Sequence, residues 1–572
     1  METNEKELTG YPSIDKPWLK YYSEEAINAP LPEKTMYQYV YDNNKDHLSD
    51  IAFIYYGGKI SYGDFFDNIH NTVKAFRAFG IVCGDIVTIM SMHTPETVCA
   101  IYALNYIGAI ANLIYMTLSE NEIVNAIKNT DSKMLMVLEP ALDRINREKI
   151  DIPVVVLSVS QSMALPIKAA YTLKNKVSKH SFITFNDFIV KGKNTEIGKS
   201  STDCKTTSVI VYTSGTTGEP KGVCLSSFNI NSVVYQFQIS GNVYGRQETF
   251  LDIIPPFFAY GVSMIQLAIS SGLLTTLHIN VDAENVAQEF MKVKPNHFAS
   301  GPAFLDSIVS NMKGDMSSLI NFTGGGGAIS EDKEFELNKT LKEHGANVKY
   351  LIGYGMTELS AAVCACFNHI YKAQTVGVPL PKSCVKILNM ENGEEQTYEQ
   401  VGEVCFSGPS IMMGYYNNID ATNEIISVDS TGNKWLNTGD LGYVDKEGFL
   451  HITGKIKRIY ITKGADDATY KLFPKQIENL FEENHYVESC AVIVKDNEIK
   501  LTVPIAFITL KENNTDRNNV IKALWKKAKL DLPSHMIPID IIAIDNMPMT
   551  PSGKIDYRAL EKMAEEMENK NE

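Results

Sequence analysis

The sequence lacks two features that mark many nucleic-acid-binding and membrane proteins: a basic stripe and a long uninterrupted apolar run. Its 572 residues carry 53 Lys and Arg against 68 Asp and Glu, a formal net charge of −15. Such an acidic chain is poorly matched to a nucleic acid or an anionic membrane surface. We therefore expect no nucleic-acid partner. A polyphosphate ligand would have to be held by local dipoles and a few lysines.

The longest apolar stretch, residues 98–116, is interrupted by two asparagines and a glycine. Its length alone would suffice for a membrane span. However, residues 94–96 (Thr-Pro-Glu) supply an N-cap, a proline at the first helical position and an acidic first turn. We therefore predict a buried helix that stops near Gly108, then a buried strand over 109–114, and no membrane span.

Cysteine pairs at metal-binding or redox spacing are also missing. The nine cysteines are scattered, and the closest two, Cys364 and Cys366, are separated by one residue. A metal or disulfide framework is therefore not expected, and a reducing compartment fits this pattern. The N-terminal METNEKE is polar and acidic, unlike a signal peptide. The expected localisation is cytoplasmic.

The chain is too long for one core and predicts more than one domain. Short continuous apolar runs alternate with helical patterns, which favours α/β sheets covered on both faces. These runs lie at residues 86–90, 134–138, 154–157 and 209–212. After residues 454–458 the pattern becomes that of a small α+β unit of roughly 115 residues. Its expected helices cover 474–484, 516–529 and 556–567, and its expected strands cover 489–494, 501–510 and 538–544.

We therefore predict a large α/β N-terminal domain, residues 1–456, and a small mobile α+β C-terminal domain, residues 457–572. The large domain should contain layered sheets with helices and a β-rich part.

The most informative motif is the turn YTSGTTGEPKG at residues 212–222, which follows a predicted strand. Glycines let backbone N–H groups approach an anion, hydroxyls donate hydrogen bonds, and lysine adds a mobile charge. The composition suits a polyphosphate, although a surface loop could have it too. It is not a Walker loop, because Lys221 is followed by glycine rather than Ser or Thr.

Four later motifs add further candidate ligands. The glycine run at 323–330 leaves a side-chain void or lets the backbone touch a ligand. GYGMTE at 353–358 offers an aromatic face, a hydroxyl and a hard carboxylate ligand for Mg²⁺. TGD at 438–440 places a carboxylate suited to ribose hydroxyls, and PSGKID at 551–556 places a lysine on a loop. Taken singly, each has an ordinary alternative as a turn, a strand–helix junction or a solvated lysine.

The order and spacing of these motifs resemble the adenylate-forming superfamily, which includes acyl-CoA synthetases, adenylation domains of peptide synthetases and beetle luciferases. The resemblance extends over about residues 50–565. Members join a carboxylic acid to ATP, giving acyl-AMP and pyrophosphate, and many then pass the acyl group to a thiol. The resemblance implies ATP, Mg²⁺ and CoA, or a carrier-protein phosphopantetheine in place of CoA.

The resemblance also implies residue roles. Thr357, Glu358 and Lys554 would be catalytic: Glu358 would bind Mg²⁺, and Lys554 would bridge the carboxylate, the α-phosphate and the ribose. Tyr354 would stack on adenine, and Asp440 would hold the ribose hydroxyls. The other nucleotide-binding residues would be Thr213, Ser214, Gly215, Thr216, Thr217, Gly218, Lys221, Gly326, Gly355, Met356 and Lys455.

Two positions depart from the family pattern. Members usually carry arginine where Lys455 stands, fifteen residues after Asp440, and lysine lacks the bidentate fork. Lys457 matches the hinge about which the small domain rotates between the half-reactions. Residues 464–469 resemble a short insertion in a loop that usually lines the thiol entry, which leaves the acceptor open.

The segment at 255–262 matches the part of the family that lines the acyl pocket. Amino-acid-activating members commonly carry an aspartate here, and this chain has none. Phe258 stands where many acyl-CoA synthetases have histidine. A fatty or aryl acid is therefore expected. The predicted pocket residues are Phe257, Phe258, Tyr260, Gly261, Gly324 and Gly325.

We accordingly predict an AMP-forming acid–thiol ligase of the acyl-CoA synthetase type, acting on a fatty or aryl carboxylic acid in fatty acid metabolism. One alternative is a ligase that loads a carrier-protein phosphopantetheine. Another is a non-catalytic ligand sensor on the same fold. A non-catalytic sensor would be expected to lack Glu358 or Lys554, and this sequence has both.

Overall fold

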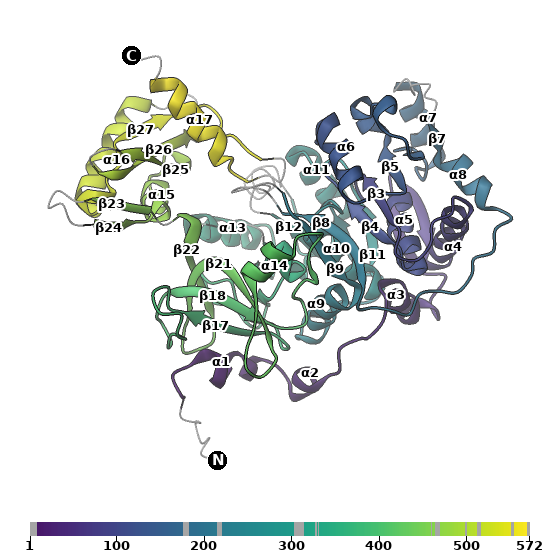
Figure 1. The fold of residues 1–572 in the computed structure, drawn as a ribbon, viewed down its shortest axis with the longest axis horizontal. Helices are drawn as coiled ribbons and strands as arrows, with labels where there is room; N and C mark the ends of the chain where they lie inside the picture. The colour runs from purple at the N-terminus through teal and green to yellow at the C-terminus, as the bar shows by residue number, and fades with distance from the viewer. Residues whose placement is uncertain are drawn as a thin grey trace.

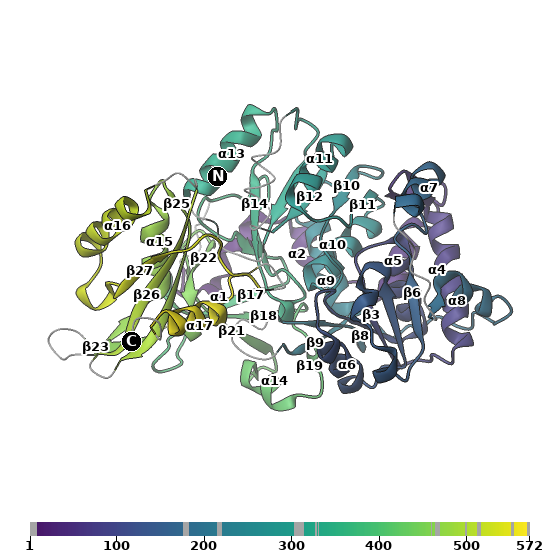
Figure 2. The same cartoon turned by 90° about the horizontal axis from the view of Figure 1, so that it is seen from above.

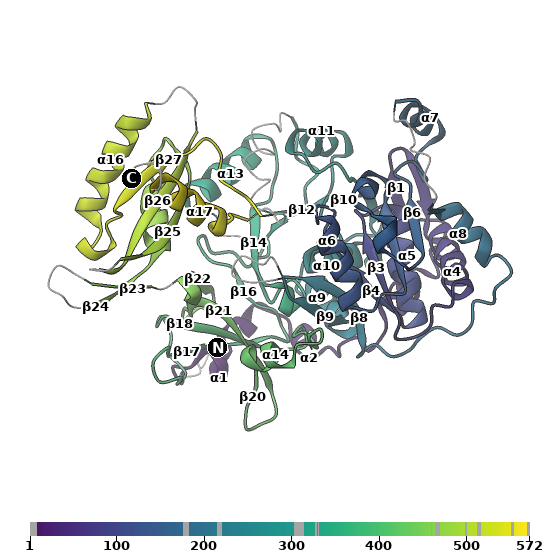
Figure 3. The same ribbon diagram turned by 45° about the horizontal axis from the view of Figure 1, so that its top comes forward.

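The protein is represented by a computed structural model that describes residues 8–174, 182–213, 220–301, 314–325, 329, 331–458, 460–463, 469–497, 500–511, 516–550 and 554–568. Figures 1, 2 and 3 agree on the arrangement of its parts. A small C-terminal domain lies at one end, a helix-covered sheet lies at the other, and a second large sheet lies between them. This is the predicted combination of a large α/β part and a smaller α+β domain.

The sheet farthest from the C-terminal domain has the strand order β19-β9-β8-β4-β3-β5-β6-β7 in the described part of the chain. Strands β3 to β8 pair in parallel, and β9 runs antiparallel to β8. The bounds are β3 Ile86–Met90, β4 Ile110–Leu113, β5 Met134–Leu138, β6 Val154–Leu157, β7 Ile183–Thr184, β8 Thr207–Tyr212, β9 Gly222–Ser226 and β19 Gly414–Tyr415. The four apolar runs predicted as strands are β3, β5, β6 and β8, so these predictions are confirmed.

Helix α5 (Pro95–Ile107) accounts for the long apolar stretch. Thr94 caps it by accepting from the backbone N–H of Thr97, and Gly108 ends it with φ +83°. Every residue of α5 is buried, and β4 follows it, as predicted. Within the described residues, no helix combines the length and apolar character that a membrane crossing needs.

The central sheet has the order β16-β15-β14-β13-β12-β10-β11-β1-β2. Its strands are β1 Ile51–Tyr55, β2 Gly58–Ser61, β10 Thr249–Asp252, β11 Leu274–Leu277, β12 His297–Ser300, β13 Asn321–Gly324, β14 Tyr350–Tyr354, β15 Cys364–Ala365 and β16 Val378–Pro379. Strands β12, β13 and β14 are parallel neighbours. Since parallel strands end at one edge of a sheet, the motifs after β13 and β14 are brought side by side.

Helices pack on both sheets and share one core with them. The largest hydrophobic cluster includes Phe53 of β1, Ile89 of β3 and Leu104 of α5. The helices of the large domain are α1 Pro12–Asp15, α2 Glu24–Asn28, α3 Met36–Asn44, α4 Tyr62–Ala78, α6 Glu120–Asn129, α7 Leu165–Lys174, α8 Phe185–Gly192, α9 Ser227–Ile239, α10 Ala259–Ser270, α11 Ala283–Val293, α13 Glu331–Glu343 and α14 Ile419–Ile425. Short 3-10 turns are η1 Pro17–Tyr21, η2 Glu139–Arg144, η3 Arg147–Lys149, η4 Thr357–Leu359, η5 Ile456–Arg458 and η6 Ser534–Met536.

A β-rich part completes the large domain, as predicted. It is an antiparallel sheet of β17 Cys384–Leu388, β18 Gly402–Ser407, β20 Ile426–Val428, β21 Lys434–Val444 and β22 Leu450–Lys455. In its register Asp440 of β21 lies opposite Lys455 of β22. The ribose candidate and the residue that departs from the family pattern are therefore cross-strand neighbours.

The C-terminal domain contains the predicted elements in the predicted order. They are α15 Pro474–Glu482, β25 Val487–Asn497, β26 Leu501–Leu510, α16 Arg517–Asp531, β27 Asp540–Ala543 and α17 Tyr557–Glu568. A hairpin of β23 (Tyr460–Lys463) and β24 (Thr469–Leu472) precedes them, with Lys463 paired to Thr469. Most of the segment interpreted as an insertion, residues 464–468, lies outside the described residues.

Candidate active site

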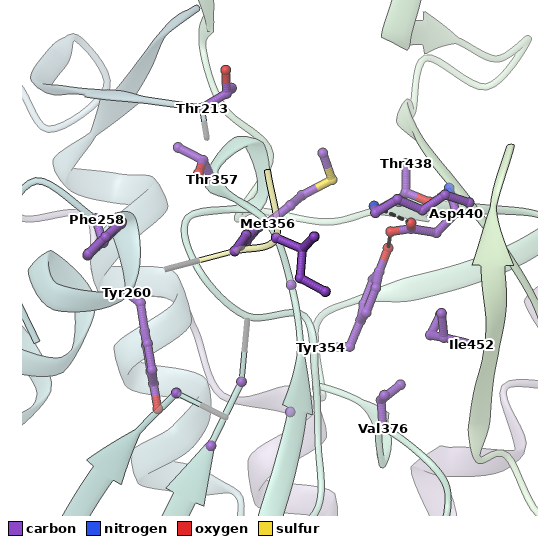
Figure 4. A pocket seen from close by; sticks show the side chains of 18 of the residues that line it. Thr213, Phe258, Tyr260, Tyr354, Met356, Thr357, Val376, Thr438, Asp440 and Ile452 are labelled. Carbon is purple, nitrogen blue, oxygen red and sulfur yellow. Dashed lines mark hydrogen bonds and ion pairs between the residues drawn. The ribbon is translucent and has the colours of Figure 1, made fainter. Parts of the chain in front are cut away.

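A continuous cleft of about 3570 Å³ lies where the two large sheets, the β-rich part and the small domain meet. Figure 4 shows part of it, with side chains from β14, η4 and β21 around one space. Its wall contains most of the predicted site. The predicted residues that line it are Thr213, Lys221, Phe257, Phe258, Tyr260, Gly324, Gly325, Tyr354, Gly355, Met356, Thr357, Glu358, Asp440, Lys455 and Lys554.

Asp440 is buried and is held from two sides. Its Oδ2 accepts a hydrogen bond from the Tyr354 hydroxyl at 2.6 Å, and its Oδ1 lies 2.5 Å from the Lys455 ammonium. Burial, followed by the Asp440 charge, raises the pKa of Tyr354 well above its usual value, so its hydroxyl keeps its proton and donates. The carboxylate is thereby oriented at the end of β14, where its oxygens can also meet ligand hydroxyls.

Glu358 lies in η4 directly after β14, and its side chain is buried. Its Oε1 accepts from the Tyr415 hydroxyl at 2.7 Å, and the Lys221 ammonium lies 4.9 Å from the centroid of the Tyr415 ring. Burial and the Glu358 charge raise the pKa of Tyr415. Tyr415 therefore connects the predicted metal ligand to the lysine of the phosphate loop. No motif had given it a role.

The turn after Glu358 is tightly folded. Ser360 and Ala361 have φ of +55° and +98°, values that non-glycine residues adopt only at a cost. A Cβ on Gly355 would lie 1.7 Å from the carbonyl oxygen of Ala361. Glycine is therefore required in this motif by the close approach of two backbone segments.

The phosphate loop is closed at its base. The Thr213 N–H donates to the Lys221 carbonyl at 3.1 Å, and the Lys221 N–H donates to the Thr213 hydroxyl at 3.1 Å. Just before the loop, the Tyr212 hydroxyl donates to Asn112, a fully buried residue of β4. The predicted residues Ser214, Gly215, Thr216, Thr217, Gly218 and Gly326 lie outside the described residues.

Aromatic residues form one wall of the predicted acid pocket. The Phe257 and Phe258 ring centroids lie 4.9 and 5.6 Å from that of Tyr115. Tyr260, on the first turn of α10, is partly buried; desolvation raises its pKa to about 12, and a side-chain hydrogen bond with Thr323 acts in the opposite direction. The described wall is thus mainly apolar, with uncharged hydroxyls.

At two of the predicted pocket positions, the structure gives another reason why the residue is glycine. A Cβ on Gly324 would lie 1.5 Å from the Tyr350 hydroxyl, and a Cβ on Gly261 would lie 2.0 Å from the carbonyl oxygen of Pro255. These positions make room for neighbouring protein groups rather than for a ligand. At Gly325 the nearest atom, the Gly353 carbonyl oxygen, would be 3.3 Å away.

Lys554 of the C-terminal domain lines the cleft, and its backbone is hydrogen-bonded to Thr550. Its carbonyl accepts from the Thr550 N–H at 2.7 Å, and its N–H donates to the Thr550 hydroxyl at 3.2 Å. The residue lines the cleft and is exposed to solvent. Partial desolvation of its ammonium group, and then the Lys455 charge, lower its pKa, while Asp440 and Glu358 act in the opposite direction. Charged groups from three separate motifs therefore influence the pKa of this one ammonium group.

The sequence was compared with family models of known proteins, and two of them match it. The family model "AMP-binding enzyme" matches residues 40–416, and the model "AMP-binding enzyme C-terminal domain" matches residues 476–554.

The chain belongs to the AMP-binding enzyme family.

Curated relatives of this AMP-binding enzyme are CoA ligases. A probable 4-coumarate–CoA ligase 1 of Dictyostelium discoideum is 28% identical over 548 residues, covering 94% of this chain and 96% of the relative. A long-chain-fatty-acid–CoA ligase of Bacillus subtilis is 25% identical over 578 residues, covering 97% and 99%.

Solved structures share the fold. The o-succinylbenzoate CoA synthetase MenE of Bacillus subtilis, in complex with its acyl-adenylate intermediate, matches with a TM-score of 0.73 at 21% identity, covering 91% of this chain and 97% of that one. The anthranilate CoA ligase AuaEII, in complex with anthranoyl-AMP, matches with a TM-score of 0.78 at 19% identity, covering 94% and 98%. The match to both large and small domains confirms the predicted fold class.

The site of this AMP-binding enzyme gives a testable pH dependence. If adenylation needs a charged Lys554, its lowered pKa should make kcat/KM for acyl-AMP formation fall at a pH below the usual lysine range. Because Lys455 contributes to that lowering, Lys455→Ala should move this alkaline limb to higher pH. Lys455→Arg keeps the charge and should leave the limb in place. A limb that Lys455→Ala leaves unmoved would contradict the assignment to Lys554.

Proposed function

We propose that the protein is an acyl-CoA synthetase that joins a carboxylic acid to ATP, giving acyl-AMP and pyrophosphate, and then transfers the acyl group to the thiol of CoA. The observation that carries this proposal is the position of Lys554. It lies in one cleft with Glu358, Asp440 and the ends of the phosphate loop. The curated CoA-ligase relatives support an acid–thiol ligase.

The proposed first step joins two anionic groups at phosphorus. Asp440, oriented by Tyr354 and Lys455, would hold the ribose hydroxyls, and Tyr354 would present its ring to adenine. Thr213, Lys221 and the loop between them would hold the β- and γ-phosphates. Negative charge builds on the oxygens around the α-phosphate as the acid attacks. A positioned Lys554 ammonium, together with the Thr357 hydroxyl, would stabilise that charge more than it stabilises the separated substrates.

The residues present also fit Mg²⁺. Glu358 supplies a hard carboxylate ligand close to the phosphate-loop lysine, and Mg²⁺ typically takes one or two protein carboxylates and several waters. Among the described residues, no group of three or more His, Cys, Asp and Glu gathers into a metal site. This fits an ion that takes its remaining ligands from phosphate and water. When bound, Mg²⁺ neutralises charge on the leaving pyrophosphate.

For the second step we propose that the small domain, from residue 457 onward, rotates about Lys457. Rotation would withdraw Lys554 and open a path for the thiol. The short connection η5 supports this, because it follows β22 of the large domain and precedes the hairpin of the small one.

The acid is proposed to be fatty or aryl. The Phe257, Phe258 and Tyr115 rings supply an apolar wall, and no aspartate stands in residues 255–262 to hold an α-ammonium. The relatives include both a probable 4-coumarate–CoA ligase and a long-chain-fatty-acid–CoA ligase, so both classes of acid belong in the test.

The test is pyrophosphate release with ATP, Mg²⁺ and a panel of fatty, aryl and amino acids, each with and without CoA. We expect a fatty or aryl acid to turn over, with an acyl-CoA product and a rate that rises with CoA. Stoichiometric acyl-AMP that CoA does not discharge would instead point to a carrier-protein acceptor. Best activity with an amino acid would overturn the proposed substrate class.

A further inference from the structure

Arg458 is the first residue after the proposed hinge, and three elements of the small domain hold its side chain. Its Nη2 donates to Glu478 Oε1 of α15 at 2.7 Å and to the Val492 carbonyl of β25 at 2.8 Å. Its Nη1 donates to the Tyr557 hydroxyl of α17 at 2.9 Å and to Glu478 Oε2 at 3.3 Å. The planar fork of arginine suits such simultaneous contacts.

The cluster is centred on a buried carboxylate, Glu478, with Arg458 and Tyr557 partly buried around it. The Glu478 side chain is 2% exposed and that of Arg458 is 18% exposed. The Arg458 guanidinium lies 4.2 Å from the centroid of the Tyr557 ring, and the Tyr557 hydroxyl donates to Glu478 at 3.3 Å. Glu478 Oε1 also accepts from the Val492 N–H at 2.9 Å. Each charged group is paired and hydrogen-bonded, which is the condition for an ion pair to be rigid at this depth.

Tyr557 connects this cluster to the loop that carries Lys554. It is the first residue of α17 and follows Lys554 by three positions. The Asp556 N–H donates to the Pro548 carbonyl at 2.8 Å, and the Asp556 side chain accepts from the Ala559 N–H at 3.1 Å. The Asp556–Pro548 hydrogen bond therefore holds the two ends of the loop together. Arg458 holds Tyr557, the residue that follows the loop. In Figure 1 the yellow segment before α17 reaches from the small domain toward the large one.

We propose that Arg458, with Glu478 and Tyr557, forms a clamp that couples the hinge to the Lys554 loop. With the clamp closed, a change of backbone angle at the hinge moves the loop and the rest of the small domain as one body. Lys554 then returns to the same position at each adenylation. Arg458 is thus a positioning residue that acts through Lys554. The inference rests on the proposed two-step function.

The experiment measures acyl-AMP formation by pyrophosphate exchange for Arg458→Met in two backgrounds, wild type and Lys554→Ala. In the wild-type background we expect kcat to fall about tenfold with KM for ATP nearly unchanged. Displacement of a positioned group by about 1 Å can cost as much as 10²-fold. In the Lys554→Ala background the same substitution should cause no further loss, because the group that it positions is absent.

Equal losses in both backgrounds would overturn the proposal, since Arg458 would then act independently of Lys554. Arg517→Met is the matched control. Arg517 is an exposed residue of the same domain that pairs with Asp545, and its loss should change neither rate. Arg458→Met leaves Glu478 buried without its main partner, which destabilises the domain. Two further variants test the proposal if Arg458→Met does not fold. Tyr557→Phe keeps the ring, and Arg458→Met with Glu478→Met removes both charges.

A second readout does not depend on the reaction. Amide hydrogen exchange over residues 546–556 should become faster in Arg458→Met and stay unchanged in Arg517→Met. Unchanged exchange in both variants would overturn the clamp even if the enzyme is active. A wild-type protein that forms no acyl-AMP with any acid would overturn the proposed function, while the exchange result would still decide whether Arg458 fixes the loop.

Discussion

Replacing Lys554 by alanine is expected to lower the rate of acyl-AMP formation about 10²- to 10³-fold, the usual cost of removing one preorganised charge-stabilising group. The physical reason is the position of its ammonium group, on which Glu358, Asp440 and Lys455 all act. Transfer of a supplied acyl-AMP to CoA should stay close to the wild-type rate, because Lys554 is proposed to leave the cleft before that step. Pyrophosphate exchange measures the first half-reaction, and acyl-CoA formation from synthetic acyl-AMP measures the second.

The control for Lys554→Ala is Lys562→Ala. Lys562 lies in the same domain, on α17, and its exposed side chain is 3.9 Å from Glu566, so its removal should change neither half-reaction. An adenylation rate unaffected by Lys554→Ala would show that the lysine is not the proposed bridging group. A loss of similar size in both half-reactions would show that Lys554→Ala damages the domain as a whole.

Local signals in the sequence were sufficient wherever one segment contained all the groups that define an element. Thr94, Pro95 and Gly108 specify the start and end of α5 without help from distant residues. The runs that became β3, β5 and β6 were recognisable because they are apolar on both faces. The motifs around Glu358 and Asp440 were likewise found because each is a short contiguous string.

Partners from distant segments could not be predicted in this way. Tyr415 lies 57 positions from Glu358, and the sequence gives no reason to pair them. Arg458 is separated from Tyr557 by 99 positions. In the sequence it is one of several charged residues near the proposed hinge, and nothing there indicates its partner. Asn112 is a fully buried residue of an apolar strand, and it also pairs with distant segments: its Nδ2 donates to the Thr88 hydroxyl and its Oδ1 accepts from the Tyr212 hydroxyl.

Glycine motifs show a second limit of sequence reasoning. The run at 323–330 predicted space for a ligand, yet the space beside Gly324 is taken by the Tyr350 hydroxyl. A glycine in such a motif indicates that a Cβ would not fit or that the backbone needs a positive φ. It does not say whether a substrate or another part of the chain occupies the place. At Gly325 a Cβ would make a tight contact, 3.3 Å from the Gly353 carbonyl oxygen, and the residue stays a candidate pocket residue because it lines the cleft.

The hinge provides the second large expected effect. The large domain ends in β22, the small domain begins with β23, and only η5 and one further residue connect them. On the far side, Arg458 is fixed by Glu478, Val492 and Tyr557. On the near side, Lys455 is paired across the sheet with Asp440. The proposed backbone rotation between the two half-reactions would therefore be concentrated at Ile456 and Lys457.

Lys457→Pro should accordingly reduce acyl transfer to CoA at least about 10²-fold while reducing acyl-AMP formation much less. Proline fixes φ near −65° and also restricts the residue before it, so the small domain would be held near one orientation. The present orientation, with Lys554 lining the cleft, is the one that we propose for adenylation. Lys457→Ala removes the side chain but keeps the backbone freedom, and it should retain both half-reactions.

Equal loss of the two half-reactions in Lys457→Pro would refute rotation at this residue. Selective loss of acyl transfer, with Lys457→Ala unaffected, would show that this step requires backbone freedom at this position.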